Sequence, residues 1–376
     1  MIAKKYIFIT NIPAPYRITF YNKLQEGGLE FEVLYMRERE ADRQWLVDKN
    51  AMRHSYYIDR GLYGMIGHYH FHFNPKIIYK LLKKRHDEFI IAGGWNDIDV
   101  LILVILKRLG IINNKFHFWT EANYLTIGSR NDNFLKKIIR KFVYGTCDGG
   151  QLKSGQMTAM TLKKWGIRVN RYINLPNTIE QQHFSISNAD ILSRTKNPLP
   201  ILVMPVRLNE KVKGVVNFLK AIGDHNIKRV LILIAGDGPD RGFIEDFIRS
   251  HDYIENVKVL GHCNVEKMVE IYRCANIFVL PSFSDPCPLT INEALAMKLP
   301  LLVSQMCGNH FEAVIEGENG YTFDPFDLHS IRESFVRTLE RERDWEKMGK
   351  KSGDIYFEKF EITMLVEKFI SELTCP

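Results

Sequence analysis

Short apolar runs alternate with longer amphipathic stretches along the whole chain. The runs that we assign to buried strands are residues 6–10, 88–91, 115–121, 200–205, 231–236, 257–261, 277–282 and 299–304. Each run ends in small or polar residues, and helical patterns separate one run from the next. This alternation predicts an α/β protein whose parallel sheets are covered by helices. Residues 11–17 then form a loop at the carboxyl end of the first strand.

Two helices of the first half are marked by their own residue pattern. Asn74 and Pro75 suit an N-cap and a first helical position, and four apolar residues follow on one face. From about residue 132 to 143, apolar residues four apart share a helix with Lys136, Lys137, Arg140 and Lys141. We expect an apolar stripe facing the core and a solvated basic face. The alternative is that either basic helix lies on an anionic bilayer.

The alternation breaks at residues 173–180 and restarts, after a polar stretch, at Pro200. We therefore expect an N-terminal domain over residues 1–180 and a second domain over residues 181–355. The 376 residues are 45% hydrophobic and 25% charged, which excludes a disordered chain, collagen and a coiled coil.

Charge is divided unevenly between the two halves. Residues 1–185 contain 28 lysines and arginines against 16 aspartates and glutamates, whereas residues 186–376 contain 23 against 28. A basic half favours an anionic partner, either a membrane surface or a nucleic acid, although a solvated face explains most charge runs. No nucleic-acid-binding module is recognisable, so we expect no nucleic acid partner.

The six cysteines form no CxxC pair, which favours reduced thiols and excludes a disulfide scaffold or a zinc ribbon. The N-terminus contains too few consecutive apolar residues for a signal peptide. The longest apolar run, residues 100–106, is far below the length of a membrane span. We expect a cytoplasmic protein, with peripheral attachment to the inner face of the plasma membrane as the alternative.

The stretch most specific for chemistry is residues 281–304. A buried strand leads to a loop with Asp285, and Pro288 then opens a helix that carries Glu293. Backbone N–H groups near Leu289 and Thr290 would be unpaired at that helix end and suit a diphosphate. Asp285 and Glu293 flank this site, and carboxylates accept hydrogen bonds from sugar hydroxyls. The alternative is a carboxylate that only offsets the helix dipole.

This stretch resembles the retaining GT-B glycosyltransferases of the family 4 type, whose pattern is an acid, seven residues, then Glu-Ala. Further segments resemble the family in the same order along the chain: residues 203–214, 234–247, 257–262 and 307–325. The first domain matches only through residues 11–17 and 175–180. The resemblance implies two Rossmann-like domains facing across a cleft, with the helix of residues 356–376 crossing back to the first domain.

The resemblance also implies roles for individual residues. Arg207 and Lys213 would neutralise the donor diphosphate, Glu293 would hold the ribose hydroxyls, and Asp285 would hold the transferred sugar. Further donor contacts would come from Gly236 and Gly238, which let the backbone approach the nucleotide, from His262 beside the base, and from Leu289 and Thr290.

The sequence departs from the family pattern at several points. Asp285 replaces the usual first Glu, residues 286–288 replace Gly-Phe-Gly, and residues 13–15 replace the N-terminal glycine loop. The interval between Arg207 and Lys213 is one residue longer than the Arg-to-Lys interval usual in the family, so Lys211 could substitute for Lys213. These departures bear on the identity of the donor sugar more than on the reaction class.

Other polar residues are candidates for metal or acceptor binding. His68, His70 and His72 alternate as they would on one strand face, a possible metal geometry, and Asp97 with Asp99 resembles a metal-holding pair. We favour no metal, because the histidines lack an acid nearby and Asp97 suits an N-cap.

Three further residues are candidates for the acceptor side. Glu121 ends a strand and is a candidate for acceptor binding or for a base-like role. Tyr16 and Arg17 are candidates for acceptor contact, with a simple turn as the alternative. His117, in the same segment as Glu121, fits a packed strand residue better.

The resemblance implies a retaining, metal-independent hexosyltransferase with a UDP or GDP sugar as donor and no other cofactor. Resemblance to bacterial polysaccharide-assembly members implies a saccharide or lipid-linked saccharide acceptor. The alternatives are an epimerase or hydrolase of nucleotide sugars with the same fold, or a non-catalytic nucleotide-sugar-binding subunit.

Overall fold

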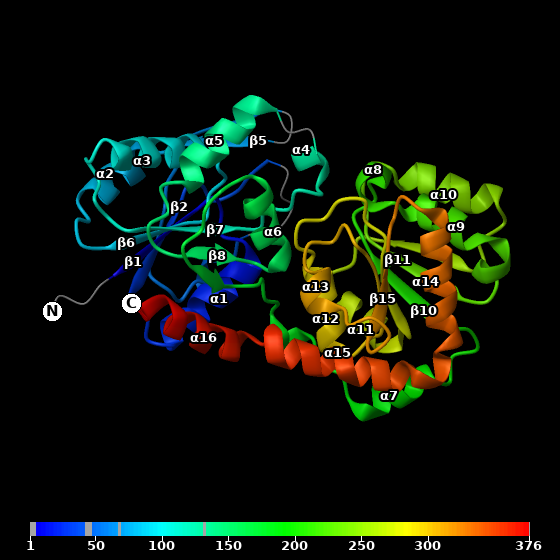
Figure 1. Ribbon diagram of the computed structural model, residues 1–376. Helices are drawn as coiled ribbons and strands as arrows, with labels where there is room; N and C mark the ends of the chain where they lie inside the picture. Colours follow the sequence, from blue (N-terminus) through cyan, green and yellow to red (C-terminus); the bar gives the residue numbers. More distant parts are fainter. Residues whose placement is uncertain (1–4, 42–46, 67–68, 131–132, 376) are drawn as a thin grey trace. The chain divides into compact units, whose positions relative to one another are not determined.

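The computed structural model describes residues 5–41, 47–66, 69–130 and 133–375. The chain forms two units (Figure 1). Unit 1 contains the described residues up to 122, residues 133–178 and residues 362–375, and unit 2 contains residues 123–130 and 179–361. The main boundary thus lies between Thr178 and Ile179. Residues 123–130 belong to unit 2 although they precede this boundary, and residues 362–375 belong to unit 1 although they follow it.

Unit 1 is built on a seven-stranded parallel sheet in the order β3-β2-β1-β6-β7-β8-β9. Its strands are β1 (Tyr6–Thr10), β2 (Phe31–Tyr35), β3 (Tyr56–Ile58), β6 (Glu88–Ile91), β7 (Phe116–Thr120), β8 (Gln151–Lys153) and β9 (Tyr172–Asn174). A separate antiparallel hairpin joins β4 (Leu62–Ile66) to β5 (Tyr69–Phe73). The order runs outward in both directions from β1, which defines a doubly wound sheet.

Helices cover both faces of this sheet, and β1 is therefore buried along its whole length. Tyr6 and Phe8 point to a core shared with α1 and α16, whereas Ile7 and Ile9 point to the core under the other helices. The helices of unit 1 are α1 (Pro15–Glu26), η1 (Lys49–Ala51), α2 (Pro75–Leu82), α3 (Ile98–Arg108), α5 (Phe134–Tyr144), α6 (Gln156–Lys164) and α16 (Ile362–Thr374).

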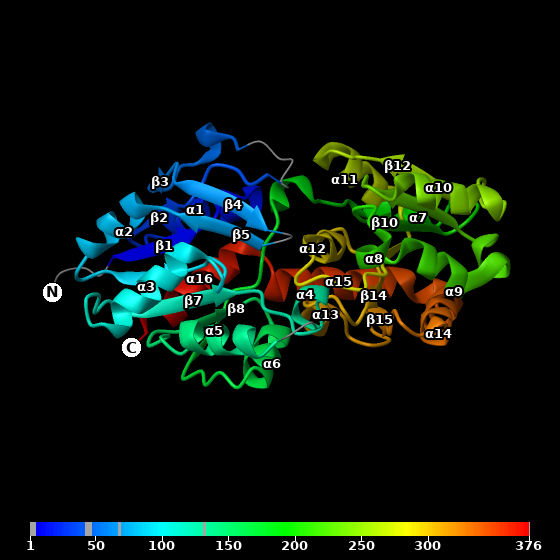
Figure 2. The same ribbon diagram turned by 90° about the horizontal axis from the view of Figure 1, so that it is seen from above.

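The last helix completes the core of unit 1. Phe369 of α16 is fully buried, and its ring lies 5.8 Å from that of Phe20 on α1. The two helices lie side by side in both ribbon views (Figures 1 and 2). Residues 362–375 are therefore held by apolar packing on unit 1 although they follow unit 2 in the chain.

Unit 2 has a six-stranded parallel sheet in the order β12-β11-β10-β13-β14-β15. Its strands are β10 (Ile201–Pro205), β11 (Leu231–Ala235), β12 (Val257–Gly261), β13 (Ile277–Leu280), β14 (Leu301–Ser304) and β15 (Gly320–Phe323). Counted in order of appearance, this is the 3-2-1-4-5-6 arrangement of a Rossmann fold. The strand order reverses between β10 and β13, and ligands of such sheets bind at the carboxyl ends of the strands beside that point.

The helices of unit 2 are mostly the connections between these strands. They are α4 (Ile127–Arg130), η2 (Gln181–His183), α7 (Asn188–Arg194), α8 (Glu210–Lys213), α9 (Val215–Ile227), α10 (Arg241–Ser250), α11 (Val265–Cys274), α12 (Leu289–Ala296), α13 (His310–Ala313), α14 (Leu328–Glu340), η3 (Glu342–Asp344) and α15 (Trp345–Lys359). Helix α9 packs with α14, and α12 packs with α15.

Two local predictions from the sequence are wrong. Residues 15–17 are not loop, because α1 begins at Pro15, whose fixed φ suits the first helical position. Helix α5 does not bury its whole apolar stripe: Phe134 is 78% exposed, while Arg140, expected in solvent, is 2% exposed. The Arg140 guanidinium lies 3.9 Å from the centre of the Trp165 ring and 4.8 Å from that of Trp95, so cation–π contacts draw it inward.

Candidate functional site

The two loops at the switch point of unit 2 carry a cation and an anion that contact each other. Lys213 is the last residue of α8, which follows β10, and Asp285 lies in the loop after β13. The Lys213 ammonium donates to Asp285 Oδ2, and both side chains are largely buried, with 17% and 13% exposure. Lys211, the alternative cation, is exposed and lies outside this pair.

Backbone contacts hold these two loops together. The N–H groups of Phe283 and Ser284 donate to the Val212 carbonyl, at 2.9 and 3.2 Å. Gly214 ends α8 with φ +64°, and a side chain there would lie 2.9 Å from the Pro281 carbonyl oxygen. Only glycine suits both that conformation and that close approach. The Lys213–Asp285 pair is therefore positioned by packing of the main chain.

At the N-terminus of α12, the N-cap residue makes no side-chain capping hydrogen bond among the described residues. Pro288 occupies the N-cap position without a side-chain hydrogen bond, and the first turn contains no acidic residue. Leu289 and Thr290, which begin the helix, are partly exposed. The first N–H groups and the helix dipole thus offer partial positive charge to a ligand anion.

Glu293, one turn into α12, is partly buried, and its carboxylate contacts a tyrosine hydroxyl. The hydroxyl of Tyr272 on α11 donates to Glu293 Oε2 at 2.7 Å. Burial raises the pKa of Glu293 to about 7, and the hydrogen bond from Tyr272 partly opposes that rise. Such a carboxylate can gain further hydrogen bonds from ligand hydroxyls. Tyr272 is a residue that sequence reasoning missed, because a tyrosine within an amphipathic helix gives no signal.

The remaining residues that the sequence predicted on the donor side lie at the ends of β10, β11 and β12. Arg207 and His262 are exposed there. At Gly236 a Cβ would lie 1.9 Å from the Val206 carbonyl oxygen, and at Gly238 a Cβ would lie 2.4 Å from that of Leu208. Packing between the two loops alone therefore requires glycine at both positions.

A short segment from the first half of the sequence also packs on the Asp285 loop. The backbone N–H of Ile127 donates to Ser284 Oγ at 3.1 Å, and Asn123 Nδ2 donates to the Met306 carbonyl at 3.5 Å. The Gly308 N–H, in turn, donates to the Asp285 carbonyl at 2.9 Å. No feature of the sequence predicts this placement, since the segment has no apolar periodicity of its own.

In unit 1, the residues predicted for acceptor contact form one polar cluster. Arg17 Nη2 lies 3.2 Å from Glu121 Oε1, and Asn177 Nδ2 donates to the same oxygen at 3.0 Å. The Arg17 guanidinium lies 4.1 Å from the centre of the Trp119 ring, and its Nε donates to the Tyr16 hydroxyl at 3.4 Å. Asn177 and Trp119 are the members of this cluster that the sequence analysis did not assign.

The predicted metal alternatives are engaged in other contacts. Asp97 is the N-cap of α3, as expected, and its Oδ2 is hydrogen-bonded to His72 Nδ1 at 2.6 Å. Asp99 accepts from the backbone and the side chain of Asn74. His70 is hydrogen-bonded to the Tyr63 hydroxyl, and His68 lies outside the described residues. Within the described part of the chain, no group of three or more His, Cys, Asp or Glu residues could hold a metal ion.

His117 is a packed strand residue, as the sequence analysis favoured. It is 2% exposed, its Nε2 lies 2.8 Å from Glu88 Oε2, and its Nδ1 accepts from the Gly150 N–H at 2.7 Å. Both ring nitrogens are therefore used within the core of unit 1.

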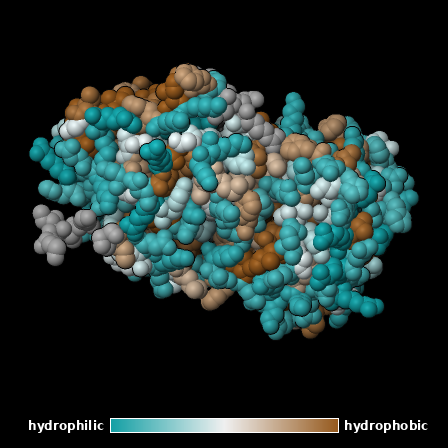
Figure 3. Space-filling view, in the orientation of Figure 1, coloured by the Kyte–Doolittle hydropathy of each residue, from teal (hydrophilic) through white to brown (hydrophobic). Residues whose placement is uncertain are grey.

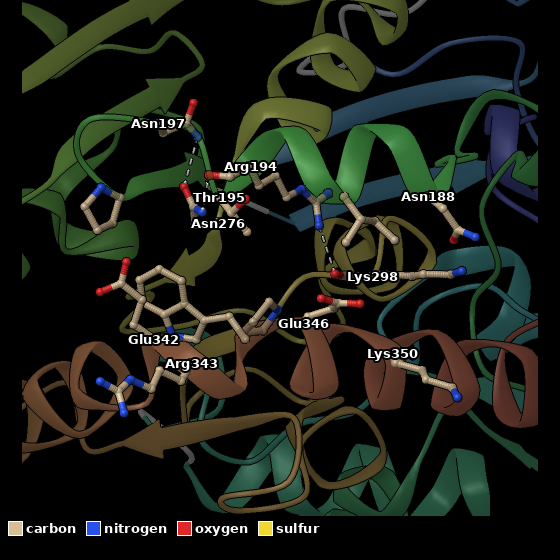
Figure 4. Close-up of a pocket in the computed structure, with 14 residues that line it drawn as sticks. Asn188, Arg194, Thr195, Asn197, Asn276, Lys298, Glu342, Arg343, Glu346 and Lys350 are labelled. Carbon is tan, nitrogen blue, oxygen red and sulfur yellow. Dashed lines mark hydrogen bonds between the residues drawn. The ribbon is translucent and has the colours of Figure 1, made fainter.

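A cavity of about 430 Å³ lies at the opposite, amino edge of the unit 2 sheet (Figure 4). Its deepest polar group, Arg194, donates to the carbonyls of Tyr272 and Arg273 at the end of α11 and of Met297 and Lys298 after α12. The guanidinium thus satisfies carbonyl groups that two helix ends leave unpaired. This cavity therefore lies at a structural junction, at the edge opposite the one that carries the Lys213–Asp285 pair.

Known proteins resemble the chain in both sequence and fold. Residues 191–353 match the family model of glycosyl transferases group 1. A glycogen synthase of Bacillus cereus is 26% identical over 300 residues, which cover 74% of this chain and 60% of that protein. The chain thus spans about 60% of the length of this curated relative.

Solved structures extend the likeness to the whole chain. Sucrose-phosphate synthase from Thermosynechococcus elongatus has a TM-score of 0.72 at 16% identity and 98% coverage of both chains. Anabaena HepE in complex with UDP has a TM-score of 0.75 at 12% identity, with 98% of this chain and 99% of that chain covered. At these identities the likeness concerns the fold, which is the GT-B fold with two Rossmann-like units. Together with the match of residues 191–353 to the family model, the fold makes the chain similar to the glycosyl transferases group 1 proteins.

Proposed function

We propose that the protein is a retaining glycosyltransferase that moves a hexosyl unit from a nucleotide diphosphate sugar to a saccharide or lipid-linked saccharide acceptor. The observation that carries this proposal is the Lys213–Asp285 pair at the switch point of unit 2, next in the chain to the uncapped α12 N-terminus. A cation for the diphosphate and an acceptor for sugar hydroxyls lie side by side there, and the diphosphate and the sugar are likewise adjacent in the donor.

In this proposal the donor lies along the carboxyl edge of the unit 2 sheet. Lys213, Arg207 and the N–H groups of Leu289 and Thr290 bind the diphosphate, and Asp285 accepts from hydroxyls of the transferred sugar. Glu293 accepts from the two ribose hydroxyls. Gly236, Gly238 and His262 border the nucleoside. The solved structure of HepE with UDP makes UDP the first nucleotide to test.

The proposed chemistry needs no residue as nucleophile. The bond between the sugar C1 and the donor phosphate oxygen breaks, and Lys213 and Arg207 stabilise the charge that develops on the leaving diphosphate. The acceptor hydroxyl attacks from the face that the diphosphate vacates, and its proton passes to the diphosphate, so the anomeric configuration is retained. The two cations and the helix end supply the positive charge that would otherwise require a metal ion.

Acceptor binding is proposed for the cluster of Tyr16, Arg17 and Glu121 in unit 1. The Glu121 carboxylate is held by Arg17 and Asn177, and the Arg17 guanidinium stacks on the buried Trp119 ring, which fixes its position beside the Tyr16 ring. Carboxylate, amide and aromatic groups are the side chains that bind saccharides through hydroxyls and ring faces. Together with the glycogen synthase likeness, this cluster favours a role in polysaccharide assembly.

The central test is a panel of UDP and GDP sugars, scored by the rise in unfolding temperature that each causes. The donor found in this way is then incubated with saccharide acceptors and excess chelator, and the anomeric configuration of the product is determined. Transfer with retention supports the proposal. Strict dependence on a divalent ion, inversion, or release of only free sugar or isomerised donor would contradict it. Replacing Lys213 and Glu293 together by Ala should abolish turnover.

Peripheral membrane contact through unit 1 is proposed on separate grounds. Helices α3 and α5 lie next to each other (Figure 2), and apolar surface gathers over this part of unit 1 (Figure 3). Exposed apolar residues there are Ile105, Leu109, Ile111, Phe134, Leu135 and Ile138. Lysines of α5 flank them, a combination that binds anionic bilayers. In the described part of the chain, no helix is long and apolar enough to cross a membrane.

Vesicle sedimentation tests this contact directly. The protein should sediment with vesicles that contain anionic phospholipid and remain in solution with purely zwitterionic ones. The variant Phe134→Ser with Leu135→Ser should reduce sedimentation strongly, because both side chains are exposed and their loss removes no core contact. Equal sedimentation of this variant and the wild type would refute the proposed surface.

A further inference from the structure

Unit 1 contains a second cavity that the proposed roles do not use. It has a volume of about 640 Å³ and is lined by Arg37, Glu38, Arg39, Val47, Asp59, Arg60 and Gly61. These residues follow β2 and β3, so the cavity lies at the carboxyl edge of the unit 1 sheet. Ligands of doubly wound sheets bind at this edge, and the volume is within the range of ligand pockets.

Two of the arginines at this cavity, Arg37 and Arg60, pair with no carboxylate in the part of the chain that the structure describes. None of the ion pairs among the described residues includes Arg37 or Arg60. Arg37 is nevertheless held in place, since its Nε donates to the Arg39 carbonyl at 2.7 Å and its guanidinium lies 4.2 Å from the centre of the Tyr63 ring. No hydrogen bond between described residues engages its terminal nitrogens.

The two acids at the cavity have other contacts. Glu38 forms an ion pair with Lys49 at 2.8 Å. Asp59 is 5% exposed and accepts from the Tyr57 hydroxyl at 3.3 Å. The positive charge of Arg37 and Arg60 is therefore not offset by direct pairing within the cavity wall.

We propose that this cavity binds a phosphate or diphosphate group of the acceptor, with Arg37 and Arg60 as its ligands. Guanidinium groups bind phosphate through paired N–H donors. A guanidinium that has no carboxylate partner and is already partly fixed loses little conformational entropy on binding. The inference rests on the proposed function and narrows it to acceptors that carry phosphate. Two sources of that group are distinguishable, namely a lipid-linked diphosphate and a phosphorylated sugar.

The test is calorimetric titration of the full chain with inorganic pyrophosphate in the presence of saturating UDP or GDP. The nucleotide occupies the proposed donor site, so heat from pyrophosphate reports a second site. We expect binding to persist, and to weaken at least about tenfold in Arg37→Gln with Arg60→Gln. Farnesyl diphosphate and glucose 6-phosphate, used as the next probes, indicate which source of phosphate binds more tightly.

The matched control is Arg168→Gln with Arg229→Gln, which removes two exposed arginines that do not line the cavity. It should bind pyrophosphate like the wild type. The single variant Arg60→Gln guards against misfolding, because the Arg60 side chain makes no hydrogen bond or ion pair among the described residues whose loss could destabilise the fold.

Three results would overturn the inference. The first is that saturating nucleotide abolishes the binding of pyrophosphate. The second is that the double variant Arg37→Gln with Arg60→Gln binds pyrophosphate as tightly as the wild type. The third is that glucuronate, which carries a carboxylate and no phosphate, binds as tightly as pyrophosphate. Failure of the proposed function would look different, because neither nucleotide would bind while the pyrophosphate site sensitive to Arg37 and Arg60 would remain.

Discussion

The Glu293 carboxyl should make the stability of the protein depend on pH in a direction that can be calculated. Burial raises its pKa from 4.5 to about 7 in the folded state. Between these two values the folded chain holds a proton on this group that the unfolded chain has released, so stability falls as pH rises. Each unit of separation corresponds to about 1.4 kcal/mol, which gives about 3 kcal/mol over the window.

The perturbation is Glu293→Gln, which keeps the size of the side chain and an oxygen that can accept from Tyr272. Glutamine does not ionise, so the variant lacks this pH dependence. Relative to the wild type, its free energy of unfolding should rise by about 3 kcal/mol between pH 4.5 and pH 7 and stay constant above. Other groups that titrate in this range, such as Asp99, are common to both proteins and cancel in the difference.

The assay is urea unfolding, followed by circular dichroism at half-unit steps from pH 4.5 to 8.5. At each step the dependence of the unfolding free energy on urea concentration is compared between the variant and the wild type. Tyr272→Phe provides a second test. It removes the hydrogen bond that lowers the Glu293 pKa, so in this variant the loss of stability with rising pH should continue to a higher pH than in the wild type. If the curves of the wild type and Glu293→Gln run parallel, burial does not raise this pKa and the reasoning is wrong.

Three further outcomes are expected. Lys213→Ala should weaken binding of UDP or GDP, measured by calorimetry, by about 1.5–3 kcal/mol, whereas Lys211→Ala should change it little, because only Lys213 lies at the Asp285 loop. Gly238→Ala should weaken nucleotide binding through the clash of its Cβ with the Leu208 carbonyl, whereas Gly242→Ala, whose Cβ meets nothing within 4 Å, should not. Arg194→Leu should lower the free energy of unfolding in urea by about 3 kcal/mol or more, since it leaves buried carbonyls unsatisfied.

The local pattern of the sequence was sufficient for most of the secondary structure near the site. The strands β10 to β14 lie where apolar runs end in polar residues, and Asp97 is the N-cap that its position before α3 predicts. These features depend on neighbours in the chain, which is why they can be read without coordinates. The same reasoning missed β2, β4 and β15 and the three-residue strands β3, β8 and β9.

Contacts between distant residues were beyond that reasoning. Arg140 is buried because two tryptophans from other segments enclose it, although its own helix pattern places it among solvated lysines. Tyr272 reaches Glu293 across 21 residues, and the backbone at Ile127 reaches Ser284 across 157. Helical and strand periodicity contain no information about such partners.

The sequence by itself determined the α/β class, most of the strands beside the switch point of unit 2 and the charge imbalance between the halves. Those properties follow from propensity, periodicity and composition, which act over a few residues at a time. Only the tertiary structure decided that Lys213 and Asp285 pair, that α16 belongs to unit 1, and that Arg37 and Arg60 pair with no carboxylate among the described residues. The physical reason is that ion pairing and burial depend on which surfaces meet, and many chain segments compete for each surface until the whole core is packed.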